Sequence, residues 1–166
     1  MRFMIIVKST PEFEAETQPT PDEALFAAMA AYHEDLARAG VLLDASGLQP
    51  SRKGWRIHYG ATGRRVIDGP FAEAKELIAG NASGRITRRS VVDGPFAETK
   101  ELIAGYTLIS ARSREEALEW SRRFPNPVGE GQDAVIEVRQ LYELEDFGPS
   151  ASVERFRKFH PPSQTP

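Results

Sequence analysis

His33 and Asp44 are the residues of this chain whose types and positions best suit acid–base chemistry. His33 lies late in a segment with helical periodicity, and Asp44 follows the apolar run Val41-Leu42-Leu43. A helix packed against the next strand could bring the two side chains together, and a histidine oriented by a carboxylate is a plausible general base. We therefore predict that His33 and Asp44 form a catalytic pair. The alternative is that a histidine at the margin of an apolar helix face is only a packed residue.

Four further residues are candidates for binding a small polar substrate. Glu98 and Lys100 belong to a charged motif, and Tyr106 and Arg139 lie on predicted strands that could line the same cleft. A cleft with a few convergent polar groups is the usual form of a small-molecule site. The alternative for Glu98 and Lys100 is that they form surface ion pairs, since charge runs are mostly solvated faces.

The composition excludes several classes of chemistry. The chain has 166 residues and no cysteine, which rules out disulfides, thiolate chemistry and cysteine metal sites. His58 and His160 lack partners at metal-ligand spacing. The sequence contains no dinucleotide fingerprint, phosphate loop or serine nucleophile elbow. We therefore predict no metal and no cofactor.

Charge and hydropathy also limit the partners. A net charge of −3 argues against general nucleic-acid binding. No apolar stretch approaches the length of a membrane span, and the apolar run at the amino-terminal end is too short for a secretory signal. We expect neither nucleic acid nor a membrane as a partner, and we predict a cytoplasmic location.

Helix and strand signals predict the elements that position the candidate residues. Capping residues and apolar periodicity predict a long helix over 20–39 and a shorter one from 113 to before Pro125. The segment Gly60-Ala61-Thr62-Gly63 is typical of a hairpin turn. Apolar and alternating runs predict strands near residues 3–7, 41–50, 55–59, 64–67, 106–110 and 134–141.

This order predicts an α+β protein with a ferredoxin-like βαββαβ fold and a hairpin insertion. Such a sheet carries helices on one face only. The runs at 3–7 and 106–109 are apolar on both faces, so something else must cover the second face. A second copy of the chain is the simplest cover, and we expect a homodimer packed sheet to sheet.

The segment VIDGPFAEAKELIAG at 66–80 recurs as VVDGPFAETKELIAG at 91–105, with 13 of 15 positions identical. Two copies within one domain indicate a duplicated segment, since repeat arrays usually need three or more units. Propensity alone predicts that the second half of each copy is helical. We expect the extra copy to be structural, because the surrounding elements occur only once.

The segment DGPFAETKELIAGY resembles the signature of the DGPF family, within the YCII-related (YciI-like) superfamily. The chain also resembles the usual sequences of the family in four further segments, at 39–43, 47–51, 115–120 and 136–140. The resemblance implies a dimeric α/β barrel of ferredoxin-like protomers. It also implies that the second copy leads into the central strand through 101–105, which competes with the helix prediction. Relatives are thought to use a His–Asp arrangement whose histidine lies nearer the start of the helix, closer to Met29 here.

We expect a domain over 1–147, which contains both copies of the repeat, and a tail over 148–166. The leading hypothesis for function is a protein that binds a small molecule in a cleft, with the possibility of a cofactor-free lyase or isomerase. The rival is a non-catalytic interaction or regulatory protein. The resemblance favours the rival in that family members are sometimes encoded beside alternative sigma factors. The tail, with Phe156, Phe159 and nearby basic residues, would then contact the partner.

Overall fold

The computed structural model describes residues 1–17, 22–71 and 102–159. Its centre is a four-stranded sheet of order β2-β5-β1-β6, in which each neighbouring pair of strands is antiparallel. The strands are β1 (Arg2–Lys8), β2 (Leu42–Gly47), β5 (Ile103–Ser110) and β6 (Ile136–Gln140). The predicted α+β class is confirmed, and the order is compatible with the ferredoxin-like pattern.

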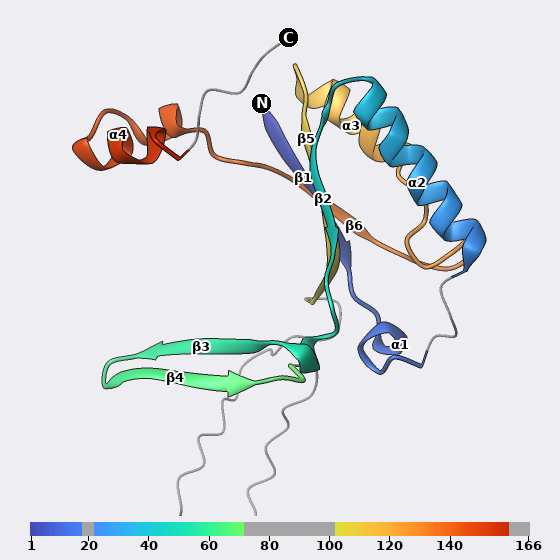
Figure 1. The fold of residues 1–166 in the computed structure, drawn as a ribbon, viewed down its shortest axis with the longest axis horizontal. Helices are drawn as coiled ribbons and strands as arrows, with labels where there is room; N and C mark the ends of the chain where they lie inside the picture. The colour runs from blue at the N-terminus through green and yellow to red at the C-terminus, as the bar shows by residue number, and fades with distance from the viewer. Residues whose placement is uncertain (18–21, 72–101, 160–166) are drawn as a thin grey trace, which may run out of the picture.

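Two helices, α2 (Glu23–Arg38) and α3 (Arg114–Arg122), cover one face of this sheet (Figure 1). The side chain of Asp22 caps α2 by accepting a hydrogen bond of 3.0 Å from the amide of Ala24. Apolar side chains at helical spacing on α2 then meet the alternating inward residues of the strands. The resulting core comprises Phe3, Ile5, Tyr32, Leu36, Ile109, Ala111 and Ala117.

No helix among the described residues lies against the other face of the sheet, which we call the open face (Figure 1). Successive residues of a strand point to opposite faces. Because Phe3 and Ile5 point toward the helices, Met4 and Ile6 point to the open face. The strand pairing places the residues of the open face in two rows that run across the sheet. One row is Arg139–Met4–Leu108–Asp44, and the other is Glu137–Ile6–Tyr106–Ser46.

The remaining elements lie outside the sheet. A two-stranded hairpin of β3 (Trp55–Gly60) and β4 (Gly63–Asp68) confirms the predicted insertion. The hairpin and α4 (Ala151–Arg157) both extend away from the open-face side (Figure 1). The short helices are α1 (Pro11–Glu14), η1 (Ser51–Lys53) and η3 (Leu144–Phe147).

The two copies of the repeat supply different parts of this fold. The first copy forms the end of β4 and continues to Phe71, whose amide donates a 3.0 Å hydrogen bond to the Ser51 hydroxyl. The second copy supplies the buried Leu102 and then enters β5 at Ile103. The helix prediction is therefore wrong for residues 103–105, because pairing with two neighbouring strands overrides local propensity. Residues 72–101, including the rest of both copies, lie outside the described part of the chain.

Candidate functional site

His33 is held on the helix side of the sheet by hydrogen bonds at both ring nitrogens. Nδ1 lies 2.7 Å from the carbonyl oxygen of Met29, one turn earlier on α2, and Nε2 lies 2.9 Å from the hydroxyl of Thr107. Thr107 is buried on β5, with 2% of its surface exposed. Because a carbonyl oxygen can only accept, Nδ1 carries a proton and donates it. Met29 and Thr107 therefore occupy both nitrogens that a catalytic histidine would need.

Asp44 lies on the open face instead, where its Oδ2 accepts a 2.7 Å hydrogen bond from the hydroxyl of Tyr106. This hydrogen bond raises the pKa of Tyr106 above its usual range, and the neighbouring Ser46 hydroxyl lowers it in part. Tyr106 therefore keeps its proton at neutral pH. The other oxygen of Asp44 has no partner within the described residues, and Asp44 is an exposed residue.

The predicted pairing of His33 with Asp44 is therefore not formed, and a β-bulge explains why. Leu42 pairs with the buried Ile109, but the register shifts before Asp44, which pairs with Leu108 of the open face. Strict alternation from Leu42 would have turned Asp44 toward the helices and His33. The extra residue, Leu43, reverses the direction of the side chains that follow.

The predicted substrate-binding residues fall into three groups. Tyr106 belongs to the Asp44 cluster. Arg139 lies on the open face at the opposite edge of the sheet, three strands from Asp44, with its guanidinium 3.8 Å from the Glu137 carboxylate. Because adjacent strands lie about 4.8 Å apart, Arg139 and Asp44 of one chain are too distant to hold the same small group. Glu98 and Lys100 lie outside the described residues, and their role remains a prediction.

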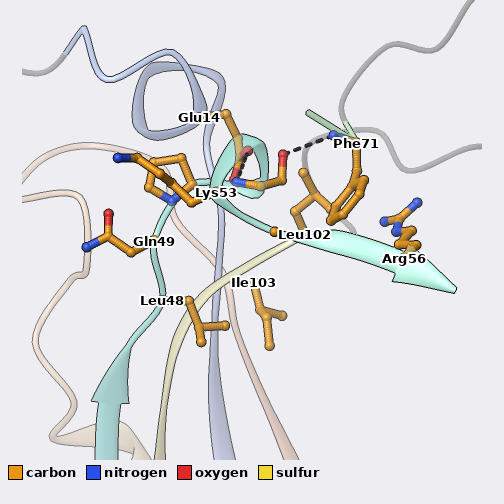
Figure 2. A pocket seen from close by; sticks show the side chains of 11 residues that line it. Glu14, Leu48, Gln49, Lys53, Arg56, Phe71, Leu102 and Ile103 are labelled. Atoms are coloured by element: carbon orange, nitrogen blue, oxygen red, sulfur yellow. Dashed lines mark hydrogen bonds between the residues drawn. The ribbon is translucent and has the colours of Figure 1, made fainter. Parts of the chain in front are cut away.

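A groove that the sequence did not reveal lies between η1, the base of the hairpin and the start of β5. Its volume is about 450 Å³. Figure 2 shows apolar side chains from both copies of the repeat, Phe71 and Leu102, on its wall. Leu48, Pro50 and Ile103 complete the apolar lining, and the charged residues at its margin are Glu14, Lys53 and Arg56.

Glu14 links α1 to η1 at this groove. Its carboxylate accepts hydrogen bonds of 2.9 Å from the hydroxyl of Ser9 and from the amide of Ser51. Burial raises the pKa of Glu14, but the hydrogen bonds from Ser51 and Ser9 outweigh it and hold the pKa below its usual value. Glu14 is therefore ionised at neutral pH, and both of its carboxylate oxygens are used in the hydrogen bonds with Ser9 and Ser51. The signal in the sequence was only a short proline-started turn after β1, which carries no chemical signature.

Clusters of potential metal ligands and helices of membrane-spanning type were both sought in the part of the chain that the structure describes. Within it, no group of three or more histidine, aspartate or glutamate residues could hold a metal ion. None of its helices is long and apolar enough to cross a membrane.

Comparison with protein families gives two matches to one family model, that of the YCII-related domain. The matched residues are 1–83 and 81–145. Each match ends or begins between the two copies of the repeat. The first contains β1 and β2 and the second contains β5 and β6, and these strands interleave in one sheet. The chain has no significant match among curated proteins.

Proposed function

Because the chain belongs to the YCII-related family, whose model covers residues 1–145 in two matches, we propose that it is a homodimeric protein that binds a small molecule over Asp44 and Tyr106 and moves a proton on it. The observation that carries this proposal is the 2.7 Å hydrogen bond between the two side chains on the open face. A carboxylate on an exposed residue, with one oxygen held by a phenol, has the form of an oriented general base.

The proposed chemistry needs only the chain's own residues. Asp44 would take a proton from a carbon beside a substrate carbonyl. A cofactor-free isomerase would return this proton at another position of the same molecule, whereas a lyase would deliver it to the leaving group whose bond to the neighbouring carbon breaks. Tyr106 would orient the Asp44 carboxylate by donating its one hydroxyl hydrogen to Oδ2. His33 has no part in this step, because Met29 and Thr107 occupy its ring nitrogens on the other face.

A second copy of the chain would enclose this site. The open face has an apolar centre of Met4, Ile6 and Leu108, with polar residues at both edges, an arrangement typical of interfaces. Asp44 lies at one edge and Arg139 at the other. A twofold axis parallel to the strands would place the Arg139 edge of one copy opposite the Asp44 edge of the other, which pairs unlike charges. Water would then be excluded from the Asp44–Tyr106 cluster, which strengthens its electrostatics.

Exchange of carbon-bound hydrogen tests the chemistry without a known substrate. The protein is incubated in D₂O with a panel of small ketones and keto acids, and loss of α-proton signals is followed by NMR. We expect exchange with at least one compound, abolition by Asp44→Asn and slower exchange with Tyr106→Phe. The matched control is Glu137→Gln, since Glu137 is also a carboxylate on the open face but pairs with Lys8. Unchanged exchange in Asp44→Asn would refute the assignment.

The rival function, capture of a protein partner by the tail, is favoured by one observation. In the tail, Phe156 and Phe159 are 56% and 77% exposed, although α4 is anchored by the buried Val153. Arg157 is already paired with Glu145 and Glu154, so the aromatic side chains are the better candidates for contact. A pull-down with the full chain and with a variant lacking residues 148–166 distinguishes the two. Specific capture that depends on the tail, together with no exchange activity, would favour the rival.

A further inference from the structure

The groove between η1, the hairpin base and β5 is separate from the Asp44–Tyr106 cluster and is not used by the proposed proton transfer. We propose that it binds a small organic acid, with the apolar body of the ligand against Leu102 and Phe71 and its carboxylate on Arg56. Lys53 adds a second positive charge at the margin.

The volume and lining suit a small, mainly apolar molecule. About 450 Å³ lies within the range of small-molecule sites, which are mostly apolar with a few placed polar groups. Leu102, which lines the groove, is only 8% exposed, so its side chain is packed in place by its neighbours. Figure 2 shows Leu48 and Ile103 gathered below Leu102, while Arg56 lies beyond Phe71. These apolar contacts would supply most of the affinity.

The charge of the groove favours an anion. Glu14 is the acidic residue that lines it, and both of its oxygens already accept hydrogen bonds from Ser9 and Ser51. Neither Lys53 nor Arg56 has a carboxylate partner within the described residues. Among the described residues that line the groove, two cations beside one engaged carboxylate give a net positive charge, which an anionic ligand would neutralise.

Arg56 is the better placed of the two cations to hold a carboxylate. Its guanidinium lies 4.2 Å from the centroid of the Phe71 ring. Stacking on an aromatic face limits the motion of the guanidinium while leaving its N–H groups free at the edge. A planar guanidinium can then donate two parallel hydrogen bonds to a carboxylate. The site therefore combines an oriented donor with an adjacent apolar surface.

The hairpin provides a matched control for this arginine. Arg64 also stacks on an aromatic ring of the hairpin, 5.0 Å from the centroid of Tyr59, but it does not line the groove. Arg56→Met and Arg64→Met therefore remove the same charge and the same type of contact. Only the first should affect a ligand in the groove.

Titration with small carboxylic acids, followed by amide chemical shifts in NMR, tests the proposal. The panel contains benzoate, phenylacetate, hexanoate and adipate, each with its neutral amide. We expect saturable binding of at least one acid, with shifts at Ser51, Gly54 and Leu102, and weaker binding of its amide. Arg56→Met should raise the Kd about tenfold, equivalent to about 1.4 kcal/mol, and Arg64→Met should leave it unchanged.

The proposal would be overturned by no saturable binding of any acid, by equal binding of acid and amide, or by an equal loss of affinity in both arginine variants. Asp44→Asn separates this site from the proposed function. Acid binding that survives in Asp44→Asn supports a second site, whereas its loss would place the acid on the open face and contradict the groove.

Discussion

Phe71, from the first copy of the repeat, and Leu102, from the second, line the same groove although residues 72–101 separate them in the chain. The first copy thus supplies the hairpin end of the motif and the second supplies the entry to the central strand. One copy of the motif would connect Phe71 to Leu102 through five residues. Six steps along the chain span up to about 20 Å, which is ample for two residues that line one groove.

Deletion of residues 72–96 should therefore give a folded protein. The deletion joins Phe71 to Ala97 and keeps every described residue. Shortening the connection from 30 residues to five lowers the entropic cost of closing this loop on folding, which favours the folded state by up to about 1.5 kcal/mol. Urea unfolding of the two proteins measures the difference. An insoluble or clearly less stable deletion variant would mean that residues 72–96 contribute contacts of their own.

Gly69→Ala should strongly destabilise the hairpin base. A Cβ at Gly69 would lie 1.8 Å from the carbonyl oxygen of Ser51, and the backbone would have to move to relieve the clash. That movement would break the 2.9 Å hydrogen bond from the Gly69 amide to the Gly54 carbonyl. We expect a loss of about 2 kcal/mol or more in thermal unfolding. Gly47→Ala is the control, since its Cβ would meet nothing within 4 Å; equal effects of the two substitutions would contradict the close approach.

Glu14→Gln should reduce stability at neutral pH but not in acid. The pKa of Glu14 is lowered in the folded state from its ordinary value of 4.5, so its contribution is present above that value and is lost as the pH falls through the folded pKa. Because Glu14 is partly exposed, we expect a loss of about 1 kcal/mol at pH 7. Urea midpoints of the two proteins at several pH values should converge as the pH falls below the folded pKa of Glu14. Glu12→Gln, on the same helix, is the control, and a pH-independent difference for Glu14→Gln would contradict the linkage.

Leu108→Lys should prevent dimerisation. Leu108 lies at the centre of the open face, and an interface there would have to remove the new ammonium group from water, a cost that its cross-strand neighbour Asp44 would offset only in part. We expect sedimentation to report a dimer for the unmodified chain and a monomer for Leu108→Lys. Leu118→Lys, which replaces a leucine that is 40% exposed on α3, should stay dimeric. A monomeric unmodified chain at micromolar concentration would refute the proposed homodimer.

The sequence by itself determined the α+β class, the long helix over His33, the hairpin and the alternation of the last strand. These features depend on local rules. Helical spacing predicts the buried side of α2, and the glycines of the turn predict the hairpin. On β6, alternation correctly separates Ile136, in contact with the core, from Glu137 on the open face. Asp44 and Tyr106 were also among the candidate residues, but the sequence predicted neither as the partner of the other.

Only the tertiary structure decided how these candidates are grouped. Strict alternation in β2 favours Asp44 beside His33, but the bulge at Leu43, formed against β5, turns it toward Tyr106. Propensity favours a helix over residues 103–105, but those residues pair in the middle of a sheet. The two copies of the repeat are nearly identical in sequence, yet one ends a hairpin and the other enters the central strand. The physical reason is the same in each case: hydrogen bonds and packing with strands distant in the sequence outweigh the preference of the local segment.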